Sequence, residues 1–281
     1  MHQPSSRLLL PWMALSQRLA RIARGGLRLI PLGVRRRFAA WTLHGLHAAG
    51  KMTVNQDLIG GGRMILDTND HLAYRIRCEE AFEPEVREEV ERIASRRVNV
   101  IDIGANIGYF TILASRLVGP EKRVFSFEPQ ANIVSKLRRN IELNALSNVE
   151  VFPFALSDTS GTSTFNVPSG GAEAYGSMHA NGRFKIEKTV QVEMHRLDDV
   201  LERLGNPKIG LVKMDAEGAE LLILRGAAKL LSSPDRPDLI FEANEINCKP
   251  FGYCVFDILQ YVHSFGYKLR QVDYEDWIAE S

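Results

Sequence analysis

Two spacings of hydrophobic residues alternate along most of this 281-residue chain. Short runs rich in β-branched and aromatic residues are typical of strands buried in a parallel sheet, and apolar residues three or four positions apart are typical of helices that pack on it. The predicted strands lie at 98–103, 124–127, 149–154, 210–214, 238–241 and 267–272. The predicted helices lie at 84–96, 109–117, 131–145, 197–204, 219–231 and 255–265.

Strands and helices take turns over residues 98–272, and no internal repeat is visible. Such alternation predicts an α/β fold with an open, mostly parallel sheet and helices on both faces. Before this core, residues 57–78 are predicted to form two short strands, at 64–66 and 73–76, around a turn at Asn69-Asp70.

One segment inside the core breaks the alternation. Residues 159–196 are polar and contain five glycines. Their flanks at 163–166 and 189–193 are strand-like, so we expect a hairpin excursion whose tip can serve as a lid. This excursion and the N-terminal region are the parts expected to choose the substrate.

Residues 1–56 form a separate segment by charge. They hold nine of the 35 basic residues and no acidic one, which leaves 26 basic against 34 acidic residues in 57–281. After Pro11, apolar residues recur on one side of a helix and arginines on the other. The sequence therefore predicts a basic amphipathic helical extension (1–56) joined to an acidic globular domain (57–281).

Three interpretations of the extension stay open: a helix packed on the domain, a helix lying on an anionic membrane surface through residues 1–50, and a targeting peptide. The sequence contains no run of 18 apolar residues, so it predicts no membrane-spanning helix. The three cysteines do not form a paired framework and indicate free thiols, so we expect a cytoplasmic protein with a possible peripheral membrane contact. Nucleic acid is a poor partner for an acidic domain without a recognition motif.

Acidic side chains follow the predicted strands where each strand ends. In open α/β sheets the carboxyl ends of the strands form the ligand-binding edge. The features at this edge are the turn Gly104–Gly108 after Asp102, then Glu128, Asp158, Asp215 and Glu217. Four acidic strand ends along one edge favour a ligand site over helix capping alone.

The turn after Asp102 narrows the kind of ligand. Asn106 and Tyr109 occupy the second and third glycine positions of a dinucleotide-binding motif, and no P-loop lysine follows. Glu128, about 24 residues beyond Gly104, is placed to accept hydrogen bonds from both hydroxyls of a ribose. An acidic edge also suits a ligand with an ammonium and a sulfonium group, so S-adenosylmethionine fits both conditions.

Five segments resemble the FkbM-type methyltransferases in order and spacing, over about residues 80–245. They are VIDIGANIGYFT at 100–111, FEP at 127–129, ALSD at 155–158, LDD at 197–199 and VKMDAEGAE at 212–220. Met214 and Ala216 depart from the family's usual isoleucine and valine. The resemblance implies a class I methyltransferase-like (Rossmann-like) fold that transfers a methyl group from S-adenosylmethionine, typically to a hydroxyl oxygen of a sugar, glycan or polyketide-like acceptor.

The resemblance also implies roles for single residues. Asp102 lies near the ammonium group of the cofactor, Glu128 holds the ribose, and Asp215 faces the transferred methyl. The turn lines the methionine part, and the ALSD segment borders the adenine. The cofactor-binding residues expected in this way are Asp102, Gly104, Ala105, Asn106, Gly108, Tyr109, Glu128, Pro129, Ser157 and Asp158.

A neutral hydroxyl acceptor needs a general base to take its proton. The candidates are Asp215, Glu217 and Glu242, and Asp215 comes first because it ends the fourth strand. Lys213 is expected to pair with Asp215. His179 and His195 are weaker candidates for the base. The same three carboxylates offer an alternative role as Mg²⁺ ligands, but we assign no metal site.

Two other functions compete with an O-methyltransferase. One is a membrane-peripheral binding protein whose methyltransferase-like domain is not catalytic. The other is a nucleic-acid methyltransferase, against which the acidic domain argues.

Overall fold

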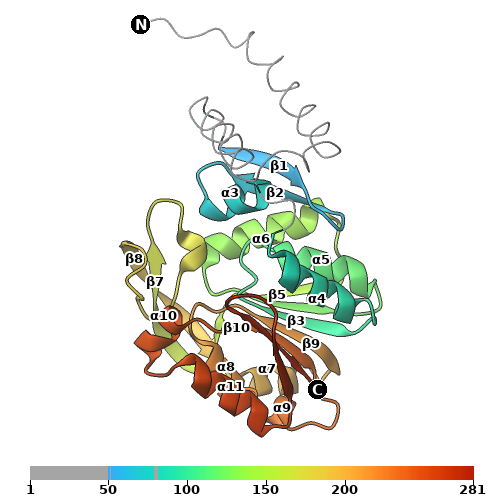
Figure 1. Cartoon of the computed structure of the whole chain (residues 1–281). Coiled ribbons are helices and arrows are strands. Elements are labelled where there is room, and N and C mark those ends of the chain that lie inside the picture. The colour runs from blue at the N-terminus through green and yellow to red at the C-terminus, as the bar shows by residue number, and fades with distance from the viewer. Residues whose placement is uncertain (1–49, 51, 79–81) are drawn as a thin grey trace, which may run out of the picture.

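A seven-stranded sheet runs through the computed structural model, which describes residues 50, 52–78 and 82–281 (Figure 1). The strand order is β11-β12-β10-β9-β3-β4-β5. The strands are β3 (Asn99–Ile103), β4 (Val124–Phe127), β5 (Val149–Phe152), β9 (Ile209–Met214), β10 (Asp238–Glu242), β11 (Lys268–Gln271) and β12 (Asp276–Glu280). All pairs from β10 to β5 are parallel, and only β12 runs antiparallel to β10 and β11. The predicted open, mostly parallel sheet of class I methyltransferase-like type is confirmed.

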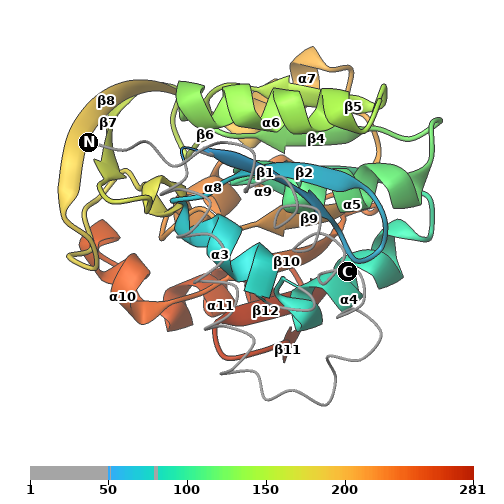
Figure 2. The same ribbon diagram turned by 90° about the horizontal axis from the view of Figure 1, so that it is seen from above.

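Helices cover both faces of this sheet because successive strand residues point to opposite faces. Val100 of β3 packs in the apolar cluster built with α4 and α5, whereas its neighbour Ile101 packs in the cluster built with α7, α8 and α11. Figure 1 shows α4, α5 and α6 on one side of the sheet and α7, α8, α9 and α11 on the other, and Figure 2 looks down on the first group from above. The helices of the domain are α4 (Pro84–Ala94), α5 (Tyr109–Val118), α6 (Ala131–Leu143), α7 (Leu197–Arg203), α8 (Glu220–Arg225), α9 (Ala228–Leu231), α10 (Glu245–Cys248) and α11 (Val255–Ser264).

The first described elements are a hairpin, β1 (Thr53–Asp57) and β2 (Arg63–Asp67), and a helix, α3 (His71–Cys78). The strand expected at 64–66 is confirmed, and the strand expected at 73–76 is wrong. Asp70 explains the difference, because its carboxylate accepts a hydrogen bond from the Leu72 N–H at 2.8 Å and so caps a helix instead of shaping a turn.

The predicted helix at 219–231 is two helices, α8 and α9, which separate at Gly226. A Cβ at Gly226 would lie 2.1 Å from the Ser157 carbonyl oxygen, so the backbone of 157 and that of 226 are in close contact. The Asp198 carboxylate caps the N-terminus of α9, since it accepts hydrogen bonds from the N–H groups of Lys229 (2.9 Å) and Leu230 (3.1 Å).

The structure contains the hairpin expected within 159–196, and its role as a lid stays a prediction. Strands β7 (Gly161–Pro168) and β8 (Ile186–His195) pair antiparallel, and β6 (Ala155–Leu156) adds a third strand beside β8. Between β7 and β8 the chain forms a short 3₁₀ turn, η2 (Glu173–Tyr175), and after α10 a second one, η3 (Lys249–Phe251), follows.

The predicted helical extension lies almost entirely outside the described residues. His44 and His47 also lie outside them. Their spacing would suit a metal-binding pair on a helix, but the sequence has no acid ligand nearby, so no metal is assigned to them. The proposed boundary at 56/57 falls inside β1 and stays a prediction. Within the part of the chain that the structure describes, no helix has the length and apolar character needed to cross a bilayer.

Candidate active site

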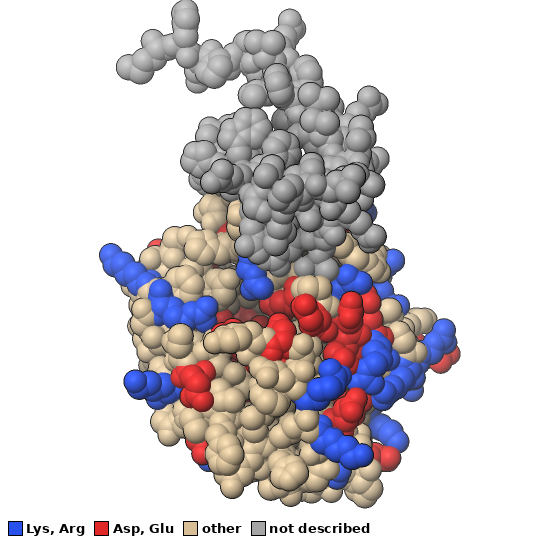
Figure 3. Space-filling model, in the orientation of Figure 1, with Lys and Arg blue, Asp and Glu red and all other residues tan. Residues whose placement is uncertain are grey.

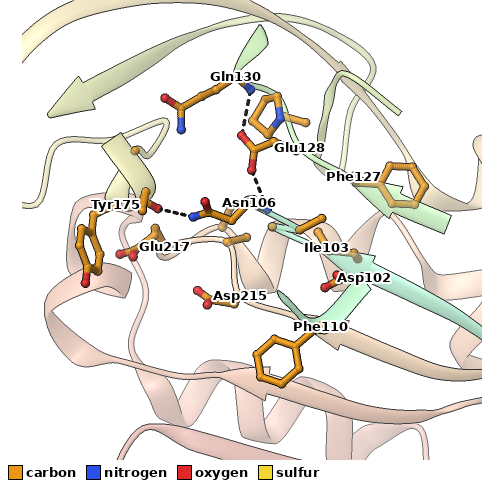
Figure 4. Close-up of a pocket in the computed structure, with 18 of the residues that line it drawn as sticks. Asp102, Ile103, Asn106, Phe110, Phe127, Glu128, Gln130, Tyr175, Asp215 and Glu217 are labelled. Atoms are coloured by element: carbon orange, nitrogen blue, oxygen red, sulfur yellow. Dashed lines mark hydrogen bonds between the residues drawn. The ribbon is translucent and has the colours of Figure 1, made fainter. Parts of the chain in front are cut away.

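A pocket lies at the carboxyl ends of β3, β4 and β9, where the sequence predicted a ligand site (Figure 4). Most of the expected residues line it: Asp102, Gly104, Ala105, Asn106, Tyr109, Glu128, Pro129, Asp215 and Glu217. Four expected residues are not part of this lining: Gly108, Ser157, Asp158 and Glu242. The structure therefore brings together the glycine-containing turn, the acid after β4 and the acids after β9.

The residues outside the lining have other contacts. A Cβ at Gly108 would lie 2.6 Å from the Leu137 side chain, so this glycine allows α5 and α6 to pack. The Ser157 N–H donates to the His195 carbonyl between β6 and β8. Glu242 does not line the pocket itself, but it shares a hydrogen-bond donor with Glu217, which does.

The turn after β3 is pressed against the end of β9. Gly104 has a φ of +73°, and a Cβ there would lie 1.7 Å from the backbone oxygen of Asp215. The Asp215 N–H donates to the Ile103 carbonyl at 3.0 Å, and the N–H groups of Gly104 and Ala105 both donate to the Phe127 carbonyl at 3.0 Å. Only glycine permits this approach, which fixes three strand ends around one pocket.

Asp102 is a buried carboxylate with one free oxygen. Its Oδ2 accepts a hydrogen bond from the Thr111 hydroxyl at 2.6 Å, and its Oδ1 has no partner. Burial raises the pKa of Asp102, while the charge of Lys213 lowers it. Buried polar atoms are normally paired, so an unpaired carboxylate oxygen in a pocket wall fits a ligand that brings a donor or a positive charge.

Glu128 is also buried, and its carboxylate bridges two segments. Its Oε2 accepts a hydrogen bond from the Asn106 N–H at 3.2 Å, and its Oε1 accepts one from the Gln130 N–H at 2.9 Å. Burial raises the pKa of Glu128 to about 7 despite these two bonds. Each oxygen keeps a second lone pair, so the group can still accept hydrogen bonds from two hydroxyls of a ligand.

Lys213 pairs with Asp215, as the sequence predicted. Its Nζ lies 3.5 Å from Asp215 Oδ2 and 4.7 Å from the centre of the Phe110 ring. Burial alone would lower the pKa of Lys213, but the charges of Asp215 and Asp102 raise it above the ordinary value. The lysine is therefore a buried cation that is stabilised by the neighbouring side chains of Asp215 and Asp102.

Glu217 and Glu242 are joined by an amide that the sequence did not reveal. Asn247 Nδ2 donates to Glu217 Oε2 at 3.0 Å and to Glu242 Oε2 at 3.2 Å, and the Arg183 guanidinium lies 3.8 Å from Glu217. Burial raises the pKa of Glu217 to about 8 and that of Glu242 well above its ordinary value. These two groups hold a proton at neutral pH more readily than an ordinary carboxyl does.

Further lining comes from segments where the sequence indicated no site. Arg75 of α3 lies 3.4 Å from Glu83 and sits over the Phe82 ring, and all three residues line the pocket. Arg75 was missed because 73–76 was predicted as a strand, and Phe82 and Glu83 stand just before the predicted helix at 84–96, where no site was expected. The excursion adds Tyr175 and Met178 to the lining, and no motif in its sequence points to them.

The two histidines considered as bases lie elsewhere. His179 contacts the edge of the Phe251 ring at 4.5 Å between centroids, and His195 contacts Phe154 at 4.4 Å. Over the described ranges, no three His, Cys, Asp or Glu side chains are arranged to hold a metal ion.

The raised carboxyl pKa values predict how stability changes with pH. Five buried acids have pKa values of about 7 or 8: Glu83, Glu128, Glu217, Glu220 and Asp276. Between their ordinary values near 4 and these raised values, the folded chain binds more protons than the unfolded chain. Their contribution to stability is thus present at low pH and is lost as pH rises through about 7 to 8.

We therefore expect the melting temperature of the ligand-free protein to be higher at pH 6 than at pH 8.5, measured by calorimetry. Glu89 and Asp257 have lowered pKa values, so they act below this window and do not oppose the trend. The variant Glu217→Gln should flatten the dependence. An equal or higher melting temperature at pH 8.5 would contradict the expectation.

Comparison with known proteins now places the chain in a family. Residues 102–269, more than half of the chain, match the family model described as the methyltransferase FkbM domain. The chain has the fold of class I S-adenosylmethionine-dependent methyltransferases. It belongs to the FkbM methyltransferase domain family, whose cofactor is S-adenosylmethionine, and the resemblance seen in the sequence is confirmed.

Three curated relatives share part of the sequence. Methyltransferase sdnD of Sordaria araneosa is 34% identical over 154 residues, which cover 45% of this chain and 59% of the relative. Hexuronic acid methyltransferase AglP of Haloferax volcanii is 32% identical, covering 47% and 51%. 2-O-methyltransferase NoeI of Sinorhizobium fredii is 28% identical, covering 47% and 58%. The chain thus spans between half and three fifths of each of these relatives.

Solved structures resemble this chain at low sequence identity and low TM-score. A SAM-dependent methyltransferase from Agrobacterium tumefaciens is 9% identical with a TM-score of 0.45, over 81% of this chain and 69% of that one. SMU.1697c, a putative methyltransferase from Streptococcus mutans in complex with SAH, is 13% identical with a TM-score of 0.40, over 69% and 96%.

Proposed function

We propose that this protein transfers a methyl group from S-adenosylmethionine to a hydroxyl oxygen of a sugar or glycan. The observation that carries the proposal is the position of Asp215. Its side chain lines the same pocket as Glu128 and as Asp102, which has one oxygen without a partner (Figure 4). A base thus shares one cavity with two acids suited to the cofactor. The names of two relatives, a hexuronic acid methyltransferase and a 2-O-methyltransferase, support this acceptor chemistry.

The residues present fit the cofactor. The free Asp102 oxygen would accept from its ammonium group, the Glu128 carboxylate from its ribose hydroxyls, and the turn Gly104–Gly108 would lie along its methionine part. When bound, S-adenosylmethionine supplies a methyl group on a positively charged sulfur. The excess of carboxylates around Lys213 favours that positive charge.

Asp215 would act as the general base. The acceptor hydroxyl would give its proton to the Asp215 carboxylate as its oxygen takes the methyl group that the cofactor supplies. Lys213, 3.5 Å away, holds this carboxylate in place through an ion pair. Phe110, Phe127 and Tyr175 in the lining exclude water, which a displacement between aligned atoms requires.

The two competing functions gain no support among the described residues. The membrane contact predicted through residues 1–50 and the cytoplasmic location predicted from the cysteines both stay predictions. The acidic balance of 57–281 still disfavours nucleic acid as the acceptor.

The reaction can be tested by incubating the protein with isotopically labelled donor and a panel of glycans, glycolipids and polyketides, followed by mass spectrometry. We expect a mass increase of one labelled methyl group on a carbohydrate acceptor. Methylation of a polyketide alone, or of RNA, would contradict the proposed acceptor class.

Cofactor binding has its own prediction. The change Glu128→Gln should weaken binding of S-adenosylhomocysteine by about tenfold or more, because the amide replaces one of the two accepting oxygens with a donor. Isothermal titration calorimetry measures it. Glu142→Gln, an exposed change on α6, is the matched control and should leave the affinity unchanged. Undetectable binding by both the wild type and Glu128→Gln would refute the assigned cofactor site.

A further inference from the structure

The Glu128 carboxylate is connected to the excursion through two amide side chains. It accepts hydrogen bonds from the backbone N–H groups of Asn106 and Gln130. The side chains of the same two residues donate to adjacent carbonyls of η2: Gln130 Nε2 to Glu173 at 2.9 Å, and Asn106 Nδ2 to Ala174 at 3.3 Å. Figure 4 shows three bonds of this chain, from Gln130 through Glu128 and Asn106 to the turn that carries Tyr175. We call η2, residues 173–175, the lid turn.

Gln130 has one more polar atom, and that atom is free. Its Oε1 is buried without a partner, although the residue lines the pocket. A buried amide oxygen is normally paired, since leaving it unpaired costs free energy. A donor group of a bound ligand would satisfy it, and the donor would then lie next to the proposed ribose site at Glu128.

The lid turn packs directly on Gln130. A Cβ at Gly176 would lie 2.9 Å from Gln130 Nε2 and 2.5 Å from the Phe165 ring, so a glycine is needed where the excursion crosses this side chain. One residue further on, the Ser177 hydroxyl donates to the Glu217 carbonyl at 2.8 Å. The turn is thereby fastened at two points of the pocket edge.

The lid turn carries Tyr175 to the side of the pocket that faces Glu217 and Arg75. Its ring stacks on Phe184 with centroids 5.0 Å apart, and the Arg183 guanidinium lies 5.8 Å from its centre. Tyr175 lines the pocket together with Asp215, the proposed base. Its position therefore shapes the space in which an acceptor must lie.

We infer that Gln130 and Asn106 are positioning residues that couple the cofactor held at Glu128 to the lid turn, so that the occupied cofactor site fixes Tyr175 on the acceptor side. A ligand that binds only the closed arrangement lowers the frequency with which the turn opens. The acceptor space is then complete only after the cofactor has bound. The inference rests on the proposed cofactor site at Glu128.

Hydrogen exchange read by mass spectrometry tests the coupling without turnover. Saturating S-adenosylhomocysteine should slow amide exchange in peptides covering 169–178 by about tenfold or more in the wild-type protein. In Gln130→Met, which keeps the size but loses both polar atoms, the slowing should fall to about threefold or less at equal occupancy. Asn106→Asp, which keeps the oxygen and loses the donor, should change it in the same direction.

Gln191→Met is the matched control, because Gln191 Nε2 bonds Thr164 within the same excursion and does not reach the pocket. It should keep the wild-type slowing. Equal slowing in the wild type and Gln130→Met, or no slowing in a wild-type protein that binds the ligand, would overturn the coupling and leave the proposed function standing. Failure of the wild type to bind S-adenosylhomocysteine would instead refute the proposed function.

Discussion

Replacing Asp215 by asparagine is expected to slow methyl transfer by about 10²–10⁴-fold, which is the usual contribution of a general base. Asparagine keeps the shape of the side chain but cannot take the acceptor's proton. The affinity for S-adenosylhomocysteine should change by about threefold or less, because Asp102 and Glu128 are assigned the contacts to the cofactor. The rate is measured in single turnovers with labelled donor and the acceptor found by the mass-spectrometric screen.

The neighbouring carboxyl provides the critical comparison. Glu217→Gln should lower the rate much less than Asp215→Asn, because the raised pKa of Glu217, about 8, leaves it largely protonated at neutral pH. Asp199→Asn should have no effect, because this half-buried residue of α7 pairs with Arg196 at 3.7 Å and does not line the pocket. If Glu217→Gln removes activity while Asp215→Asn retains it, the base is Glu217 and the assignment to Asp215 is wrong.

The change Gly104→Ala is expected to destabilise the fold by about 3 kcal/mol, of which about 1 kcal/mol comes from the left-handed backbone and the rest from displacing a neighbour. The neighbour is the Asp215 backbone oxygen, 1.7 Å from the added Cβ, and a backbone atom cannot rotate away. Urea denaturation followed by circular dichroism measures the loss. The shift of Asp215 should also reduce methyl transfer in molecules that remain folded.

Gly252→Ala separates the two causes. Gly252 has a similar φ of +83° in the left-handed region, but an added Cβ would meet no atom within 4 Å. It should cost only the backbone part, about 1 kcal/mol. Equal losses in the two variants would show that the contact between 104 and 215 does not limit stability.

The core of the fold follows from short-range pattern. Runs such as 124–127 are buried on both faces, and a strand that is apolar throughout reads clearly in the sequence. The acids after β4 and β9 were found for a related reason. The carboxyl ends of parallel strands lie along the same edge of the sheet. The residues that end these strands therefore lie close together, whatever structure the connecting segments adopt.

The parts that were missed depend on contacts between distant segments. Strand β12 was not expected, because the sequence after 272 is short and begins with acidic residues, and it pairs with β10 across more than thirty positions. The break between α8 and α9 depends on the Asp198 carboxylate, which no local periodicity reveals. The helix α3 was within reach, since the Asp70 cap and the buried Leu72, Ala73 and Ile76 have helical spacing.

The site shows the same division. The sequence identified the acids of the pocket, but it gave no sign that Gln130 and Asn247 connect them to other elements. Amide side chains in loops carry no periodic signal. Their partners are a carbonyl of the excursion in one case and two carboxylates in the other, and only the folded chain brings these groups together.

Gln130 and Asn106 bond to the backbone carbonyl groups of residues 173 and 174, which are present whatever the side chain. Evolution or a protein engineer can therefore exchange side chains along this stretch without giving up either hydrogen bond from Gln130 and Asn106. Position 175 is then the place to randomise in a library for new substrate preference, because variants there keep both backbone hydrogen bonds that position the turn.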